Sequence, residues 1–451
     1  MDKKVSVLII GAGLCGSLHA IMLAQKGYNV KLYEKRPDMR TIEMGGGRSI
    51  NLALSNRGIA ALKMVGLEEE VKSLCIPMYG RQLHLADGTQ RFSSYSGRAD
   101  EYINSISREG LNILLLNKAE AFAKVDLVFN MECKAIELVT GVSKFLDHKT
   151  DKEISLTTDI CFGTDGAGSI VRRNMLGKTT DLLFNYSQDF LRHGYKELSI
   201  PPAADGGWRI EKNALHIWPR GAHMMIALPN LDGSFTVTMF NPYEGDVGFN
   251  TIDTEEKIMN YFTSEFPDVL EHMPDLVQDY FDNPVGTLGT IKCYPWQAYG
   301  KNCLLGDAAH AIVPFYGQGM NASLEDVKVF SEHMEMGFEN WETLLQKYQD
   351  NRKPNADAIG DLALDNFYEM KEHVSQADFI QKRILEMKME QTFPDYYSKY
   401  ALVTFREDLS YQEAMNLGRK QDDLLLDLCK NTEADKLNLD EVYTKVKALH
   451  V

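Results

Sequence analysis

The stretch VSVLIIGAGLCGSLHAIMLAQKGYNVKLYEKR, residues 5–36, decides the fold. Val5–Ile10 is a β-rich apolar run, typical of a parallel strand that is covered on both faces. Ser17–Gln25 carries helix-forming residues and is followed by Gly27, where a helix is expected to end. Val30–Glu34 is a second β-rich run. Strand, glycine turn, helix and strand in this order predict a βαβ unit with a right-handed crossover.

The glycines of the turn have the spacing Gly11-x-Gly13-x-x-Gly16. The first permits a tight turn, the second lets a pyrophosphate approach the backbone, and the third packs the helix on the sheet. The N-terminus of that helix would then face the anion. Glu34, at the end of the second strand, would accept the ribose hydroxyls and repel a 2′-phosphate, so the tightly held nucleotide is expected not to be NADP. The alternative is a chance glycine turn.

Composition places the chain among ordinary soluble globular proteins of two or three domains. It has 451 residues, 44% hydrophobic and 25% charged, with a net charge of −16. This acidity argues against a nucleic-acid partner and, more weakly, against an anionic membrane surface. The seven cysteines are scattered, which predicts neither a disulfide framework nor a metal site and fits a reducing cytoplasm.

One segment imitates a membrane signal. Residues 5–25 contain no acid, lysine or arginine and follow Lys3-Lys4, as in a signal peptide or a marginal spanning helix. Glycines weaken any helix there, so a strand, a turn and a buried helix explain the run better. Residues 351–451 contain no apolar run long enough to span a bilayer. We therefore expect a soluble, cytoplasmic protein that does not enter a membrane.

A second stretch, NCLLGDAAHAIVPFYGQGMN at residues 302–321, completes the glycine motif. Many FAD proteins with such an N-terminus return late in the chain with a strand that ends in Gly-Asp, whose acid binds the ribityl chain. Asp307 is the candidate, and a helix-capping aspartate is the alternative. The 314–319 turn would bring backbone N–H groups toward the flavin ring at the start of a helix over 321–334. His310 is predicted to be a buried structural histidine.

A third element, FGTDGAGSIVRR at residues 162–173, reads as a strand, an acidic turn and an arginine pair that form a second loop facing the nucleotide. Taken in isolation, the same stretch is a turn and the start of a helix. Together the three elements resemble the single-component flavin aromatic hydroxylases, whose fold is named for p-hydroxybenzoate hydroxylase. The segments GRSINLALSNRG, HIWPR with MMIALPN, and VPFYGQGMN are similar to the members that act on L-kynurenine. The resemblance runs from Lys4 to about Tyr411. It implies FAD held tightly without a covalent bond, NADPH as a transient reductant and O2 as co-substrate.

The resemblance predicts an α/β fold in four segments: a Rossmann-type FAD-binding domain, an inserted antiparallel-sheet substrate domain and a C-terminal helical region. The FAD-binding domain would comprise residues 1–170 and 283–350, the inserted domain 171–282, and the helical cap 351–451. Two patterns support this arrangement. Residues 81–95 read as a hairpin with Asp87-Gly88 as its turn, and the segment 78–100 would contribute to the substrate site. Residues 216–240 alternate as in an antiparallel sheet.

The resemblance also assigns the site residues. The cofactor contacts would be Gly11, Gly13, Leu14, Cys15, Gly16, Tyr33, Glu34, Arg36, Ala53, Arg108, Cys133, Asp307, Gly319, Met320 and Asn321. The substrate contacts would be Arg81, Tyr95, Asn366 and Tyr400. Cys133 would act through its backbone, with an inert thiol.

Two of the substrate contacts have independent chemical support. An arginine offers a fork for an amino-acid carboxylate, and Arg81 and Tyr95 can pair across the hairpin. Asn366 places an amide in an apolar helical stripe, where the substrate or a backbone carbonyl would satisfy it. The chain departs from the family at Tyr316, where members often carry histidine, which leaves substrate choice open there.

The implied activity is hydroxylation of L-kynurenine to 3-hydroxykynurenine through a flavin C4a-hydroperoxide, a step of tryptophan degradation. Because the amino group of the substrate activates its ring, we assign no catalytic acid or base, and no metal is expected. Two alternatives stay open at this point: a related flavin monooxygenase that acts on another aromatic acid, and a non-enzymatic FAD-binding protein. The WxWxIP segment of flavin halogenases is absent from the sequence.

Overall fold

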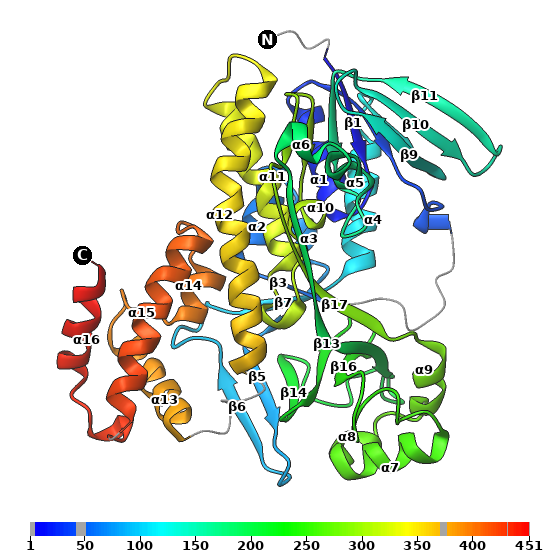
Figure 1. Cartoon of the computed structure of the whole chain (residues 1–451). Coiled ribbons are helices and arrows are strands. Elements are labelled where there is room, and N and C mark those ends of the chain that lie inside the picture. The colour runs from blue at the N-terminus through cyan, green and yellow to red at the C-terminus, as the bar shows by residue number, and fades with distance from the viewer. Residues whose placement is uncertain (1–4, 42–50, 370–376, 431, 451) are drawn as a thin grey trace.

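The structure, a computed structural model, describes residues 5–41, 51–369, 377–430 and 432–450. A six-stranded sheet in the order β18-β19-β12-β1-β2-β8 forms its first layer (Figure 1). Strand β1 (Ser6–Ile10) lies between β12 (Ile160–Gly163) and β2 (Asn29–Tyr33) and runs parallel to both. The βαβ unit expected from residues 5–36 is confirmed. The glycine-rich part of the segment at 42–50 lies outside the described residues.

Helix α1 (Leu14–Gln25) packs between the sheet and α11 (Gly319–Glu335), and almost all of its residues are buried. At its centre, His19 is fully buried and makes edge contacts with Phe162 and Phe330, with ring centroids 4.4 Å and 5.0 Å away. Within the residues that the structure describes, neither ring nitrogen of His19 has a hydrogen-bond partner. The helix that carries the glycine motif is therefore fixed on both sides by apolar packing.

A seven-stranded sheet in the order β17-β13-β16-β15-β14-β5-β6 forms the second layer. The predicted hairpin is confirmed as β5 and β6, and the alternating segment as β14 to β16. All pairs are antiparallel except β14 with β5. The strands are β5 (Gly80–His84), β6 (Gln90–Ser94), β13 (Asn185–Ile200), β14 (Ala214–Arg220), β15 (His223–Pro229), β16 (Phe235–Pro242) and β17 (Gly286–Tyr294).

The apolar pattern of residues 125–138 predicts one continuous strand, and this prediction is wrong. Asn130 has a φ of 61° and reverses the chain after β8 (Val125–Val128). The chain then leaves the six-stranded sheet and enters β9 (Met131–Glu137) of a separate three-stranded sheet. An asparagine tolerates this left-handed conformation, and the apolar pattern of the segment did not reveal the break.

The other strands belong to the six-stranded sheet or to two three-stranded sheets, β11-β10-β9 and β3-β7-β4. The strands are β3 (Asn51–Leu54), β4 (Cys75–Met78), β7 (Ile103–Ser107), β10 (Val142–Asp147), β11 (Lys152–Thr157), β18 (Gln297–Ala298) and β19 (Asn302–Leu304). The helices before α11 are α2 (Asn56–Met64), α3 (Glu68–Lys72), α4 (Arg108–Glu120), α5 (Ile170–Leu176), α6 (Thr179–Leu182), α7 (Glu255–Glu265), α8 (Pro267–Leu270), α9 (Leu276–Asp282) and α10 (Asp307–His310).

The C-terminal part is helical, as predicted, and its shorter helices lie to one side, beside the β5–β6 hairpin (Figure 1). The helices are α12 (Trp341–Tyr368), α13 (Ala377–Thr392), α14 (Lys399–Phe405), α15 (Tyr411–Cys429) and α16 (Leu439–Lys447). The helical cap was expected from residue 351, but α12 already begins at Trp341 and continues through Pro354. The α/β fold class with an antiparallel second sheet and a C-terminal helical region is confirmed. The division into four segments and its boundaries stay a prediction, and β17 pairs with β13 in the second sheet.

Two further observations bear on the expectations. All seven cysteines are free, and six of them are buried. Among the helices of the described residues, none combines the length and the apolar character needed to cross a bilayer.

His19 makes the stability of the fold depend on pH. Burial lowers the pKa of His19 to about 3, against the opposing charge of Asp326. Below its ordinary pKa of 6.5 the unfolded chain binds a proton that the folded chain refuses until about pH 3, so stability falls as pH falls through this window. We expect His19→Leu to remove this dependence. Between pH 7 and pH 5, the free energy of unfolding of His19→Leu, relative to that of the unchanged protein, should increase by about 2 kcal/mol in urea unfolding. A difference in free energy of unfolding that does not change with pH would contradict the conclusion that the buried His19 is neutral.

Candidate active site

A cavity of about 1030 Å³ lies between the two layers. The β1–α1 turn and the 314–319 turn line one side of it, and the inner face of the seven-stranded sheet lines the other. Most of its lining side chains are apolar. The structure brings these predicted site residues to its wall: Gly13, Leu14, Cys15, Ala53, Arg81, Arg108, Asp307, Gly319, Met320, Asn366 and Tyr400.

The glycine motif forms a corner with no space for a side chain at its third glycine. A Cβ atom on Gly16 would lie 2.0 Å from the carbonyl oxygen of Gly11 and 2.5 Å from Oγ1 of Thr164. Thr164 Oγ1 also lies 2.8 Å from that Gly11 oxygen, to which it donates a hydrogen bond. A Cβ on Gly13 would instead meet nothing within 4 Å. No side chain caps α1 at Gly13, so the first N–H groups of the helix are available to an anion at the cavity wall.

A second group of predicted cofactor residues lies around the end of β2, outside the cavity wall. Glu34 Oε2 accepts a hydrogen bond of 2.9 Å from the backbone N–H of Ala12, which ties it to the glycine turn. Its Oε1 accepts bonds of 3.0 Å and 2.9 Å from the backbone and Nε of Arg36. Burial raises the pKa of the Cys133 thiol to about 12, which supports the expectation that this thiol is inert.

Asp307 lies deep between the layers, yet its side chain is exposed because it opens onto the cavity. It is the first residue of α10 and follows Gly306, whose φ of 61° only glycine adopts readily here. Desolvation raises the pKa of Asp307. As a helix-initial residue it also fits the capping alternative, although α10 has no side-chain cap bond.

The 314–319 turn leads directly into α11, and Gly319 and Met320 line the cavity. The side chain of Asn321 is already engaged: it accepts from the Ser55 backbone at 2.9 Å and donates to the carbonyls of Ala53 and Gly317 at 2.8 Å and 3.0 Å. Asn321 would therefore reach a cofactor through its backbone N–H, which belongs to the first turn of the helix.

His310 is the buried structural histidine that the sequence predicted. Its Nε2 lies 2.6 Å from Oδ2 of Asp326, and both residues are buried. The same Oδ2 accepts 2.8 Å from the backbone N–H of Gly306. This contact places Asp326 directly behind the Gly306–Asp307 step.

The end of the cavity where the substrate contacts were expected contains an arginine above a stack of tyrosines. The rings of Tyr95, Tyr400 and Tyr316 follow one another nearly in parallel, with centroids 5.3 Å and 5.6 Å apart. The Arg81 guanidinium carbon lies 5.3 Å from the Tyr95 centroid and 4.6 Å from that of Tyr400. The hydroxyls of Tyr95 and Tyr316 are buried and have no hydrogen-bond partner among the described residues. The expected pairing of Arg81 with Tyr95 is confirmed, and Tyr316, where the chain departs from the family, completes the stack.

Asn366, on α12, reaches the same end of the cavity. Its Nδ2 donates to the backbone carbonyl of Phe315 at 2.5 Å. The Phe315 carbonyl is thus the backbone partner that was expected as the alternative for the Asn366 amide. The bond also connects α12 to the 314–319 turn.

Sequence reasoning missed the sheet wall and the outer end of the cavity. Alternate residues of β14 and β15 supply the wall: Leu215, Ile217, Pro219, Met224, Ile226 and Leu228. Their period-two pattern was visible, but it does not say which face meets a ligand. At the outer end, Arg383 of α13 lines the cavity and donates to the carbonyls of Ser94 and Tyr95 at 2.9 Å and 3.2 Å. No local signal marks such a contact.

Comparison with known proteins identifies the class to which this chain belongs. A family model described as an FAD binding domain matches residues 4–181 and 289–363. Among solved structures, 2-methyl-3-hydroxypyridine-5-carboxylic acid oxygenase is 20% identical with a TM-score of 0.67, covering 86% of this chain and 98% of that one. p-Nitrophenol 4-monooxygenase PnpA from Pseudomonas putida is 16% identical with a TM-score of 0.67, covering 85% and 93%. Fold and family model define the class: an FAD-binding protein with the aromatic-hydroxylase fold.

Closer relatives specify the family. Kynurenine 3-monooxygenase of Dictyostelium discoideum is 41% identical over 449 residues, covering 97% of this chain and 95% of the relative. The enzyme of the same name from Myxococcus xanthus is 42% identical, covering 94% and 91%, and that from Flavobacterium johnsoniae is 41% identical, covering 100% and 99%. The chain belongs to the kynurenine 3-monooxygenase family.

The described residues fit the FAD of this family. The Gly11–Gly16 corner offers backbone N–H groups at an open position beside the cavity, as a pyrophosphate requires. Glu34 is fixed at the end of β2, and its carboxylate keeps acceptor capacity beyond its present bonds. Asp307 opens onto the same cavity as the glycine corner and the 314–319 turn.

Substitutions at Gly13 and Gly16 should distinguish an effect on cofactor binding from an effect on stability. Gly13→Ala places a methyl group in open space where the pyrophosphate would lie, so apo stability should change by no more than about 1 kcal/mol, as for a poorer helix cap. FAD affinity should fall about 10- to 100-fold through lost backbone bonds. Gly16→Ala forces backbone atoms apart and should lower apo stability by about 1–3 kcal/mol or more. Urea unfolding of apo-protein and FAD titration check both; equal FAD affinity in Gly13→Ala would contradict the placement.

Proposed function

We propose that this chain hydroxylates L-kynurenine at the ring carbon next to the amino group, giving 3-hydroxykynurenine. NADPH is the transient reductant and O2 the co-substrate. One oxygen atom enters the ring and the other leaves as water, while NADPH is oxidised to NADP⁺ and one proton is consumed. Membership of the kynurenine 3-monooxygenase family and the cavity beside the glycine corner support this function.

The observation that carries the proposal is the state of Arg81. It lines the cavity above Tyr95 and Tyr400 and forms no ion pair with any carboxylate of the described residues. A cation that faces a largely apolar cavity without an acid partner calls for an anionic ligand. An amino-acid carboxylate matches its two-pronged fork, and the tyrosine stack offers flat apolar contact to an aromatic ring.

We assign the remaining contacts accordingly. Tyr95 and Tyr400 hold Arg81 by cation–π contact, and Asn366 acts at the 314–319 turn. For FAD, the glycine corner holds the pyrophosphate, Glu34 the adenosine ribose and Asp307 the ribityl chain. Backbone N–H groups at the start of α11 face the flavin ring, where their partial positive charge stabilises negative charge. The other predicted contacts, Leu14, Cys15, Tyr33, Arg36, Ala53, Arg108, Cys133, Met320 and Asn321, stay proposals at the positions given above.

The protein's own contribution to the reaction is positioning and the exclusion of water. Bound FAD supplies the redox chemistry, taking hydride equivalents from NADPH and activating O2. Arg81 fixes the carboxylate end of the substrate, and the apolar sheet wall directs its ring toward the 314–319 turn. The substrate's amino group supplies electron density to the ring, so no side chain has to act as a base. A dry cavity limits the wasteful release of hydrogen peroxide.

An anaerobic mixing experiment tests the proposal. Holoenzyme is mixed with NADPH in the presence or absence of L-kynurenine, and bleaching of the flavin absorbance is followed. We expect kynurenine to accelerate bleaching and, with O2 admitted, to be converted to 3-hydroxykynurenine. Acceleration by p-hydroxybenzoate in place of kynurenine would identify another aromatic acid as the substrate. A flavin that neither acid helps NADPH to reduce would indicate a non-enzymatic FAD-binding protein.

Arg81→Ala should weaken substrate binding and leave the cofactor in place. Losing a charged bidentate bond, worth about 2–3 kcal/mol, corresponds to a rise in the kynurenine KM of about 30- to 150-fold. FAD content per chain should stay unchanged, since Arg81 lies at the tyrosine end of the cavity. Arg81→Lys keeps the charge but loses the two-pronged guanidinium, so its kynurenine KM should lie between those of the unchanged protein and Arg81→Ala. Steady-state kinetics and the flavin-to-protein absorbance ratio measure both effects; apo-protein in Arg81→Ala would contradict the assignment.

A further inference from the structure

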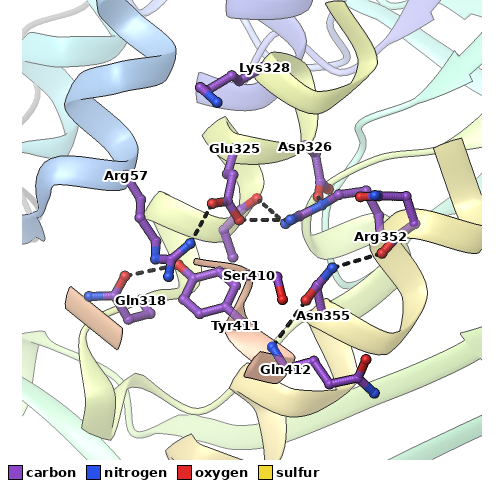
Figure 2. A network of polar contacts seen from close by, with 12 residues as sticks. Arg57, Gln318, Glu325, Asp326, Lys328, Arg352, Asn355, Ser410, Tyr411 and Gln412 are labelled. Carbon is purple, nitrogen blue, oxygen red and sulfur yellow. Dashed lines mark hydrogen bonds and ion pairs between the residues drawn. The ribbon is translucent and has the colours of Figure 1, made fainter. Parts of the chain in front are cut away.

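A cluster of buried charges lies behind the cavity, outside its lining. Arg57, Glu325, Asp326 and Arg352 belong to it, and all four are buried (Figure 2). They come from α2, α11 and α12, helices that are far apart in the sequence. None of the assignments made so far uses them.

Arg57 binds the end of α14 and the chain that follows it. Its Nε donates to the carbonyl of Val403 at 2.7 Å, and its Nη2 donates to those of Arg406 and Leu409 at 3.0 Å and 2.7 Å. These carbonyls lie at or beyond the last turn of α14, where a helix leaves acceptors unsatisfied. The same helix carries Tyr400 of the tyrosine stack. Arg57 therefore fixes one wall of the substrate end from outside.

The other side of Arg57 continues toward the Gly306–Asp307 step. Its Nη1 bonds Oε1 of Glu325 at 2.7 Å, and Arg352 bonds the second oxygen of that carboxylate at 2.7 Å. Arg352 Nε then donates to Asp326 at 2.8 Å, and Asp326 accepts the backbone N–H of Gly306 at 2.8 Å. One continuous chain of bonds thus joins α14 to the residue before Asp307.

A second branch reaches the 314–319 turn through Tyr411. The Tyr411 ring lies under the Arg57 guanidinium, 4.1 Å from its centroid to the guanidinium carbon. Its hydroxyl donates to Oε1 of Gln318 at 3.0 Å, as Figure 2 shows. Gln318 is buried and does not line the cavity, whereas its neighbours Gly317 and Gly319 do. The Tyr411 hydroxyl therefore holds the turn from the side opposite the cavity.

The position of Tyr411 is itself well defined. It is the first residue of α15, next to a capping box in which Ser410 and Glu413 bond each other's backbone N–H groups at 2.9 Å and 3.2 Å. The N–H of Gln412 donates to the side chain of Asn355 on α12 at 3.0 Å, which Figure 2 also shows. The helix start is thus anchored before Tyr411 reaches Gln318.

We propose that Arg57 and Tyr411 form a brace that positions the 314–319 turn relative to α14, with Tyr411 as a positioning residue for the hydroxylation. The turn presents backbone N–H groups to the flavin ring, and α14 presents Tyr400 to the substrate. A turn that shifts relative to α14 separates the two reacting partners, and activated oxygen is then released as hydrogen peroxide instead of entering the ring. FAD affinity depends on the glycine corner, and the brace does not contribute to it. This inference rests on the proposed function.

Tyr411→Phe tests the brace because it removes only the hydroxyl and keeps the ring under Arg57. Losing this buried hydrogen bond should raise hydrogen–deuterium exchange in the 314–322 segment of the holoenzyme about fivefold. The share of NADPH oxidation that ends as hydrogen peroxide with kynurenine present should rise roughly two- to fivefold. FAD content should stay unchanged, and the kynurenine KM within about twofold.

Tyr348→Phe is the matched control. Tyr348 is fully buried on α12, but its hydroxyl has no hydrogen-bond partner in the described part of the chain, so its loss should change neither exchange nor peroxide yield. Equal effects of the two variants would indicate a general loosening of the core and would overturn the proposal. Gln318→Met removes the acceptor, and the double variant with Tyr411→Phe should be no worse than Gln318→Met alone if both act through one bond. Additive effects would also overturn it.

The two readouts separate failure of the brace from failure of the proposed function. Hydrogen exchange of the 314–322 segment needs no substrate, so it tests the brace even in a protein that ignores kynurenine. Unchanged exchange in Tyr411→Phe would reject the brace, whatever the enzyme hydroxylates. A rise in exchange without any kynurenine turnover in the unchanged protein would reject the proposed function and retain the structural brace.

Discussion

The structure depends on the close approach of Gly16 to the Gly11 carbonyl and the Thr164 side chain at the corner of the first βαβ unit. Because a Cβ on Gly16 would lie 2.0 Å from the Gly11 oxygen, only glycine lets α1 lie this close to β1 and to the turn after β12. That approach brings the uncapped start of α1 to the cavity wall and lets Glu34 reach the Ala12 N–H. Cofactor binding, on this view, is a consequence of how tightly a helix packs on a sheet.

Around this rigid corner, the two layers contribute different chemical groups to the cavity. The first layer contributes helix starts and backbone N–H groups, which suit an anionic dinucleotide. The second contributes an apolar wall and a cation held over tyrosine rings, which suit a flat acid. Neither layer encloses a site alone. The C-terminal helices complete it, since Tyr400, Asn366 and Arg383 all come from residues after 351 and each contacts an element of the earlier layers.

Local patterns predicted the parts of this arrangement that local chemistry dictates. The first βαβ unit, the hairpin at Asp87-Gly88 and the alternating strands of residues 216–240 all follow from short-range periodicity and turn residues. The failure at residues 125–138 is of another kind, since a single left-handed Asn130 moves the chain to a different sheet. The buried charges gave no signal at all. Nothing in the sequence around Arg57 or Glu325 marks these charges as buried, and only the packing of α2 on α11 makes them partners.

The burial of those charges therefore needs a physical reason. Burial alone would raise the pKa of Glu325, but the guanidinium groups of Arg352 and Arg57 keep it below its ordinary value. Two arginines and two acids balance one another, and removing one member of such a pair typically costs about 3–5 kcal/mol. Apolar residues of similar size would stabilise the fold as well or better. Apolar residues would not fix the orientation of the helices. The Arg57 guanidinium is bound to three carbonyls and a carboxylate, so it has one orientation, and it fixes the helices that it joins relative to one another. The cluster lies where a small displacement of the 314–319 turn would matter most, so we interpret its charges as a device for geometry more than for stability.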